Sequence, residues 1–260
     1  MTAIRIGLSG TKMFYNLREI FRFEDIIMAN TTILHFTGIG SAFNAPLGNT
    51  NAYFINGTTL VMFDCGESVY PRIIRLLKSK RIRRLVILIT HLHSDHIGSL
   101  GTVLSFCDHV VPKPVDIFYP TKALERFLRC IGIGDDKYTH YLSAPDAWDL
   151  TIVPHRVVHS DMIACFGYEV VFGTASFYYS GDAHDIPDIV LKKFLDNKIE
   201  LLFHEATLDK NAAGHCCYTT LERKIPLSER SRVYCMHLGS DKLIALLRKK
   251  GFQIPNIEVP

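Results

Sequence analysis

The chain has 260 residues, of which 48% are apolar and 21% are charged, and its formal net charge is +3. This composition predicts one large globular domain or two small ones, and the small net charge excludes a global nucleic-acid footprint. No apolar run approaches the roughly 20 residues that a membrane-spanning helix needs. The seven cysteines are odd in number and no secretory signal precedes them, which predicts a reduced, cytoplasmic protein rather than a disulfide scaffold.

Residues 1–30 form an extension ahead of the predicted core. Apolar residues recur there at near-helical spacing, which permits an amphipathic helix that covers an edge of the core or docks on a partner: Met13, Phe14, Leu17, Ile20, Phe21 and Ile27. The alternative is an upstream start codon, with Met28 beginning the true core. We therefore expect one domain over residues 31–260, preceded by an extension over residues 1–30.

The first part of the domain is predicted to consist of strands and one basic helix. Residues 32–37 predict a strand, and the glycine-containing loop at residues 38–51 predicts either a tight turn or a ligand contact. A hairpin is predicted around Asn56-Gly57. Basic and apolar residues are interleaved over residues 70–84, which predicts an amphipathic helix and a basic turn. Its basic face is either solvated or an electrostatic guide for an anionic substrate.

A candidate metal motif follows the buried strand that residues 85–90 predict. His91-Leu92-His93-Ser94-Asp95-His96 holds three imidazoles and one carboxylate at the turn into a helix. His91 and His93 alternate as strand residues do and point the same way, whereas Asp95 and His96 face a neighbouring point. This arrangement suits two adjacent metal ions. Neutral imidazole with a carboxylate favours zinc, with manganese, iron or cobalt as substitutes.

Strands and helices alternate through the rest of the chain. A strand is predicted at residues 115–119, then a helix at residues 121–130 with Thr121 as its N-cap. Residues 131–149 are predicted to be irregular and include the only tryptophan, Trp148. This segment is either a lid on the site, which could cross a dimer interface, or an ordinary surface loop. The pattern predicts three strands within residues 150–180, further strands at 200–203 and 233–236, and helices at 186–195, 218–223 and 241–250.

The motif at residues 91–96 resembles the HxHxDH signature of the metallo-β-lactamase-fold hydrolases. The resemblance implies a four-layer αββα sandwich, with the remaining metal ligands on distant loops. By the same resemblance, Asp64 orients the ligand loop without touching metal. His159 matches the third metal-binding His, with His155 as its competitor. Asp182, in Ser180-Gly181-Asp182, matches the metal-bridging Asp, and His184 lies near it in the sequence.

The resemblance implies two divalent metal ions, most simply Zn²⁺ with Mn²⁺ as the alternative. One ion would be held by His91, His93 and His159, the other by Asp95, His96 and His237, and Asp182 would bridge them. Two ions roughly 3.5–4 Å apart hold a bridging water and lower its pKa, which yields the hydroxide that attacks the substrate. No redox role is implied, because the diiron flavoproteins of this fold have a Glu at the position of His93.

His204-Glu205-Ala206-Thr207, followed by His215, resembles the HEAT motif and downstream His of tRNase Z-like phosphodiesterases. In those enzymes the Glu orients a His that donates a proton to the leaving alkoxide, so the resemblance implies these roles for Glu205 and His215. Asp95 would also lie near the attacking water. The chain departs from the family in Cys216 and Cys217, where His-Ser-Thr is usual, which puts the contacts around the imidazole in question.

The combined pattern is similar to compact members of this family that degrade cyclic mononucleotides, such as the homodimeric anti-Pycsar enzymes. It predicts a cytoplasmic homodimer that hydrolyses small anionic nucleotides and has no membrane partner. The alternatives are a tRNA 3′-processing endonuclease, another hydrolase of this fold such as a lactamase, and a nucleotide-sequestering protein. Structured RNA is not expected as a partner, because residues 160–181 hold one hairpin and no basic, glycine-rich arm.

Overall fold

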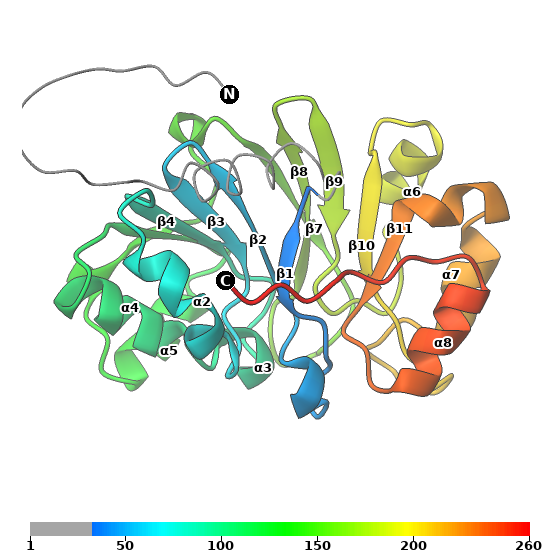
Figure 1. Cartoon of the computed structure of the whole chain (residues 1–260), viewed down its shortest axis with the longest axis horizontal. Coiled ribbons are helices and arrows are strands. Elements are labelled where there is room, and N and C mark those ends of the chain that lie inside the picture. The colour runs from blue at the N-terminus through cyan, green and yellow to red at the C-terminus, as the bar shows by residue number, and fades with distance from the viewer. Residues whose placement is uncertain (1–32) are drawn as a thin grey trace, which may run out of the picture. The chain divides into compact units, whose positions relative to one another are not determined.

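Two β-sheets pack face to face and helices cover the outer face of each, so the layers run helix, sheet, sheet, helix (Figure 1). This confirms the expected four-layer αββα sandwich. The computed structural model describes residues 33–260, of which Leu34–Pro260 form one compact unit. The N-terminal extension and its predicted helix lie outside the described residues. Within the described residues, no helix is both long and apolar enough to cross a membrane.

The first sheet follows the chain order of its strands: β1 (His35–Gly38), β2 (Asn51–Asn56), β3 (Thr59–Phe63), β4 (Arg84–Leu88), β5 (Val115–Phe118) and β6 (Thr139–Tyr141). The second sheet has the order β11 (Val233–Met236), β10 (Leu201–Glu205), β9 (Ala175–Tyr179), β8 (Phe166–Phe172) and β7 (Thr151–Arg156). The pairs from β3 to β6 are parallel, as are β9 with β10 and β10 with β11. Parallel neighbours end at the same edge of a sheet, so the loops after them converge.

Amphipathic helices supply the two outer layers. The first sheet is covered by α2 (Val69–Lys78), α4 (Leu100–His109) and α5 (Ala123–Cys130) (Figure 1). The second sheet is covered by α6 (Asp188–Leu195), α7 (Tyr218–Lys224) and α8 (Asp241–Lys249). In α2 the apolar stripe of Val69, Ile73, Leu76 and Leu77 is buried, as the helical period requires. The one-turn helix α3 (Ser94–Ile97) lies at the edge of the sandwich and carries part of the metal motif.

Aromatic side chains fill the space between the two sheets. The ring of Phe63 on β3 stacks on Tyr179 of β9 with centroids 4.6 Å apart, and it meets Phe177 edge-on at 5.8 Å. Phe36 of β1 contacts Phe203 of β10 at 5.6 Å. Each of these pairs joins one sheet to the other. Offset and edge-to-face pairs add about 0.5–1.5 kcal/mol each to the stabilisation from burial.

The C-terminal segment ties the two sheets together at their neighbouring edges. Gln253 bridges to Tyr234 of β11, and Ile257 bridges to Phe36 of β1. The Glu258 N–H donates to the Phe36 carbonyl at 2.7 Å. The segment therefore satisfies backbone groups of both edge strands, which would otherwise be free to pair with another chain.

The sequence predicted most elements to within a few residues, with two differences. Residues 131–149, expected to be irregular, include the edge strand β6, and Trp148 is buried, where its indole N–H donates to Asp116 at 3.3 Å. The N-cap of α5 is Lys122 rather than Thr121. The Thr121 hydroxyl accepts a hydrogen bond from the Ala123 N–H at 3.3 Å, so it forms a local turn before the helix.

Candidate metal centre and active site

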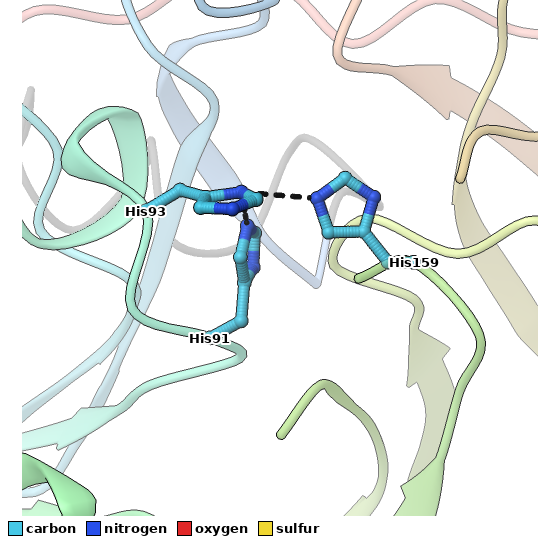
Figure 2. A group of neighbouring side chains, drawn as sticks. All are labelled: His91, His93 and His159. Carbon is cyan, nitrogen blue, oxygen red and sulfur yellow. Dashed lines mark hydrogen bonds between the residues drawn. The ribbon is translucent and has the colours of Figure 1, made fainter. Parts of the chain in front are cut away.

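Three imidazoles from two loops meet at the open side of the site (Figure 2). His91 and His93 follow β4, and His159 follows β7. His93 Nδ1 lies 3.0 Å from His91 Nε2 and 3.1 Å from His159 Nε2. Zinc–nitrogen bonds of roughly 2.0–2.1 Å put tetrahedral ligand atoms about 3.3 Å apart, so this spacing suits three ligands of one ion. His93 is exposed, and this group therefore opens to solvent.

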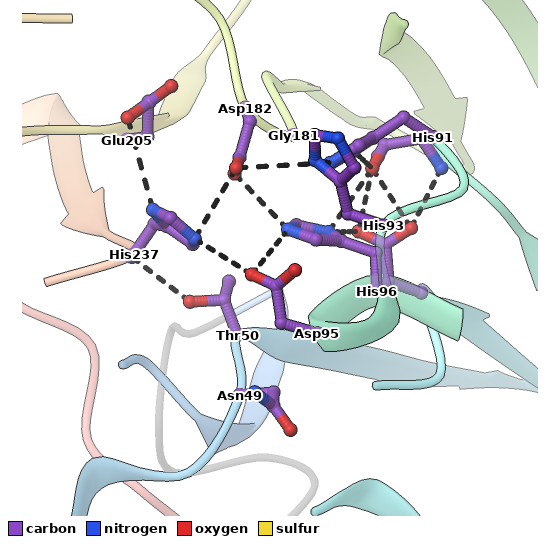
Figure 3. A network of polar contacts seen from close by, with 12 residues as sticks. Asn49, Thr50, His91, His93, Asp95, His96, Gly181, Asp182, Glu205 and His237 are labelled. Carbon is purple, nitrogen blue, oxygen red and sulfur yellow. Dashed lines mark hydrogen bonds and ion pairs between the residues drawn. The ribbon is translucent and has the colours of Figure 1, made fainter. Parts of the chain in front are cut away.

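A second group of four possible ligands lies deeper and is buried throughout: Asp95, His96, Asp182 and His237. Asp95 Oδ2 is 3.3 Å from both His96 Nε2 and His237 Nε2 (Figure 3). Asp95 and His96 lie on α3, whereas His237 follows β11, so the two sheets each contribute to the group. Two carboxylates and two imidazoles form a donor set suited to a divalent transition metal.

Asp182 lies between the two groups. Its Oδ1 is 3.3 Å from His96 Nε2, and its Oδ2 is 3.4 Å from His237 Nε2 and 3.6 Å from His159 Nε2. One carboxylate therefore faces both clusters, which is the position that a bridging ligand requires. All seven side chains expected from the sequence come together, and they group as expected. That these seven side chains are the metal ligands stays a prediction.

Unsatisfied atoms in the buried group fit a cation. His96 Nε2 and Asp182 Oδ1 are both buried without a hydrogen-bond partner. Leaving such atoms unpaired costs free energy, and a shared metal ion would satisfy both. Burial opposes ionisation of Asp182, yet the neighbouring His237 and His96 hold its carboxyl pKa well below the usual value. Burial and His96 hold the pKa of His91 well below its usual value, which favours the neutral imidazole that a metal ligand needs.

Hydrogen bonds behind the ligands fix which nitrogen faces the site. Asp64, next after β3, accepts from His96 Nδ1–H at 2.9 Å and from the Thr90 N–H at 2.7 Å. This agrees with its expected role in orienting the ligand loop. His159 Nδ1–H donates to the Gly214 carbonyl at 2.8 Å. In both histidines Nδ1 is thereby occupied and Nε2 is left for a metal.

Two contacts around these ligands were not foreseen from the sequence. A Cβ on Gly214 would lie 2.2 Å from the His159 carbonyl oxygen, so this close approach of two loops needs glycine. The Thr50 hydroxyl accepts from the His237 N–H at 3.0 Å, and His237 has a φ of 56°, which non-glycine residues rarely adopt. Gly48-Asn49-Thr50 was visible as a motif, but only the fold shows that it holds the loop after β11.

A Glu–His pair stands beside the bridging carboxylate. Glu205 ends β10 and is fully buried, and its Oε1 accepts from the Ala183 N–H at 2.5 Å. His215 Nδ1–H donates to both Glu205 oxygens, at 2.9 and 3.1 Å, and lies 3.9 Å from Asp182 Oδ2. The hydrogen bond to Glu205 raises the pKa of His215 to about 9. The imidazole is partly exposed, so its other nitrogen is available to a substrate.

The other histidines considered from the sequence lie elsewhere. His155, the competitor of His159, lies within β7 and contacts Glu169 Oε2 at 3.0 Å. His184 is exposed, and its backbone N–H donates to the Val158 carbonyl. Tyr138, His140 and Trp148 make their contacts with α5, β5 and their own segment. Those contacts hold residues 131–149 to the first sheet; a contact with a second copy stays a prediction.

Comparison with known proteins decides the family. The profile of the metallo-beta-lactamase superfamily matches residues 45–218. The chain belongs to the metallo-β-lactamase superfamily. With clusters of His and Asp that can bind metal, it is a metal-dependent hydrolase of that superfamily.

The relatives within the superfamily include two named groups. The Anti-Pycsar protein Apyc1 of Bacillus phage vB_BsuM-Goe3 is 38% identical over 252 residues, covering 86% of this chain and 95% of the phage protein. The Ribonuclease Z of Methanococcus maripaludis is 26% identical over 144 residues, and the match spans about half of each protein, 55% of this chain and 46% of the archaeal one. The crystal structure of the metallo-beta-lactamase fold protein YhfI from Bacillus subtilis has a TM-score of 0.67 at 18% identity, covering 85% of this chain and 94% of that one, which shows the shared fold.

Proposed function

We propose that this metallo-β-lactamase-superfamily protein is a dinuclear-metal phosphodiesterase that hydrolyses cyclic mononucleotides. The Glu205–His215 pair, 3.9 Å from Asp182, carries the proposal, because it places a proton donor beside the metal ligands. The likeness to Apyc1 over nearly the whole length of both chains supports a substrate of the cyclic-nucleotide class.

The residues fit a site for two divalent ions, with Zn²⁺ as the simplest choice and Mn²⁺ as the alternative. His91, His93 and His159 would hold one ion and Asp95, His96 and His237 the other, with Asp182 between them. When bound, such ions polarise phosphoryl oxygens and lower the pKa of a water that serves as nucleophile. Asp95 and Asp182 would supply negative charge that offsets the positive charge of the ions in the buried part of the site.

His215 performs the proton step that the leaving group requires. Attack of water on phosphorus breaks the bond to a sugar oxygen, and that oxygen leaves as a poor alkoxide unless it gains a proton. Protonated His215 donates this proton, and Glu205 holds the imidazole through Nδ1 so that Nε2 carries the transferred proton. A nucleotide-sequestering protein would have no use for such a pair.

A substrate panel tests the proposal. The purified protein is assayed on 2′,3′- and 3′,5′-cyclic nucleotides of each base, with products separated by chromatography, and its metal content is measured by elemental analysis. We expect turnover to linear mononucleotides and two metal ions per chain. Tight binding of cyclic nucleotides with no product would favour sequestration instead.

The second candidate function is tRNA 3′ processing, which the likeness to Ribonuclease Z favours. The discriminating assay is removal of a 3′ trailer from precursor tRNA at low enzyme concentration. Efficient removal, with cyclic nucleotides left intact, would replace the first proposal with this one. We expect little or no removal of the 3′ trailer.

We also propose that the protein acts as a cytoplasmic homodimer. Support comes from the sequence alone: its cysteines carry no disulfide pattern, and its pattern of motifs is similar to that of homodimeric enzymes. Light scattering during size-exclusion chromatography measures the mass of the oligomer directly. A monomer at assay concentration would contradict this part of the proposal and leave the chemistry intact.

A further inference from the structure

A cavity of about 380 Å³ lies beside His215, the proposed proton donor, and its lining includes none of His91, His93 and His159. Glu205, His215 and His237 line one wall, and the loop at residues 41–43 lines another. Thr207, Asp209 and Ser240 add polar groups. Its volume falls within the roughly 300–1,000 Å³ typical of small-molecule sites. The cavity and the proposed proton donor therefore belong to one continuous surface.

Phe43 is the unusual residue of this lining. Its side chain is 99% exposed, and it is the one exposed aromatic side chain among residues 33–260. The other large aromatic rings of that range are buried or half-buried. A phenyl ring held in water gains nothing from the fold of its own chain, so a ligand that covers it would gain the burial.

The loop that carries Phe43 is fixed at both sides of the ring. The Ser41 N–H donates to the Leu238 carbonyl at 3.2 Å, and the Asn44 side-chain amide donates to the same carbonyl at 2.9 Å. The Gly40 N–H donates to the Gly48 carbonyl at 2.8 Å, and a Cβ on Gly40 would lie 2.7 Å from the Asn44 carbonyl oxygen. Arg72 closes the base of the loop through the Thr37 carbonyl at 2.5 Å. Phe43 is thus presented by an anchored loop.

The position of His215, the proposed proton donor, determines which part of a substrate lies in this cavity. His215 protonates the oxygen that leaves phosphorus, and in a cyclic nucleotide this oxygen belongs to the sugar. The sugar and its base therefore extend from phosphorus toward the His215 side, where Phe43 stands. We infer that Phe43 is a specificity-determining residue that stacks on the nucleobase of the substrate. This inference rests on the proposed function, because the acid's role orients the substrate.

Stacking on an aromatic side chain tolerates every base, because each base has a π-face. By the usual strength of such stacks, Phe43→Ala should raise the KM for a cyclic nucleotide by roughly 5- to 150-fold, with kcat nearly unchanged. Phe43→Tyr should keep the KM within about twofold, because the ring remains. The inhibition constant of the product mononucleotide should rise with that KM in Phe43→Ala. Inhibition by ribose 5-phosphate, which lacks a base, should not change.

A fluorescence measurement tests the contact without turnover. The chain has one tryptophan, Trp148, which is buried, so Phe43→Trp adds a reporter at the mouth of the cavity. Titration of the metal-loaded variant with a nucleoside 5′-monophosphate should quench this reporter, and ribose 5-phosphate should not. Leu227→Trp is the matched control, since Leu227 is 72% exposed and is not part of the cavity lining. It should show no quenching.

The outcomes separate this inference from the proposed function. Quenching of Phe43→Trp by nucleotides, together with the rise in KM, supports the stack. Hydrolysis of cyclic nucleotides by Phe43→Ala with wild-type KM, and no quenching of Phe43→Trp, would overturn the stack and leave the phosphodiesterase in place. Quenching without hydrolysis of any cyclic nucleotide would overturn the phosphodiesterase and keep the base site. A change of oligomeric mass in Phe43→Ala at unchanged KM would assign Phe43 to an interface between copies and overturn the stack.

Discussion

Replacing His215 by alanine separates proton donation from the rest of the catalytic machinery. His215 is held by two contacts to the fully buried Glu205, at 2.9 and 3.1 Å, and lies 3.9 Å from Asp182. Its side chain faces solvent on one side and lies outside the seven-ligand set, so its removal should leave the metal ligands in place. General acid catalysis usually contributes about 10²–10⁴-fold, which corresponds to about 3–5 kcal/mol of transition-state stabilisation.

Comparing substrates with different leaving groups shows whether this transition-state stabilisation comes from protonation of the leaving group. On a cyclic nucleotide the leaving sugar oxygen needs the proton, so His215→Ala should lower kcat by about 10²–10⁴-fold. On bis(4-nitrophenyl) phosphate the leaving phenolate is stable without a proton, so the loss should be within about tenfold. Both rates are measured on the same metal-loaded preparation, with metal content determined for each variant. His109→Ala is the matched control, because His109 is a 71% exposed histidine on α4 that pairs with Asp108.

Equal losses on the two substrates would refute the proton-donor role. Such a result, with wild-type metal content, would mean that His215 acts on a step common to both substrates, such as binding of the phosphate. Equal losses with reduced metal content would mean that the imidazole supports the metal ligands. A large loss confined to the cyclic nucleotide is the result that the geometry leads us to expect.

Three further substitutions test other parts of the site. Asp182→Ala should lose most bound metal, because both clusters face this carboxylate, and elemental analysis that finds two ions per chain in the variant would rule out the bridging assignment. Glu205→Gln removes the carboxylate that raises the pKa of His215. Because His215 can donate a proton only below its pKa, the alkaline limb of the plot of kcat against pH should move to lower pH. An alkaline limb at the wild-type pH would count against the Glu205–His215 pair. Gly214→Ala should weaken metal affinity by about 10–100-fold, because the new Cβ would displace the carbonyl that fixes His159. Metal titration against a chelator measures this loss, with Gly239→Ala as control, since a Cβ there meets nothing closer than the Ser41 hydroxyl at 3.7 Å.

The sequence was sufficient for those parts of the site that depend on local order. His91 to His96 fall on a strand-to-helix turn whose flanking pattern is strong, and Asp182 and His237 each follow a short β-branched or aromatic strand. That these motifs converge was implied by the resemblance to the family, and the structure gives the reason, since strands that are parallel neighbours end at one edge of a sheet. The role of Asp64 in supporting the loop was likewise implied by the resemblance and not by local order.

What the sequence could not supply are contacts between loops far apart in the chain. The Gly214 carbonyl reaches His159 across 55 residues, and the Thr50 hydroxyl reaches the His237 N–H across 187. Neither contact produces a periodic pattern in the sequence, because each depends on where two loops lie after the sheets have packed. Strand β6 was missed for a related reason: Thr139–Tyr141 is three residues long at a sheet edge, too short to show alternation.

The size of the site argues for a small substrate over a structured RNA. Affinity for RNA comes largely from many phosphate contacts with Lys and Arg spread over a long surface. Between His159 and Asp182 the chain contains a short loop and the β8–β9 hairpin. Residues 160–181 include no Lys or Arg, so no basic arm extends from this part of the site. Two of the basic residues near α2 are committed to the fold, Arg72 to the Thr37 carbonyl and Arg84 to Asp116. A cavity of about 380 Å³ beside the acid is enough for one nucleotide, and one phosphate, one sugar and one base account for every contact that the proposed chemistry uses.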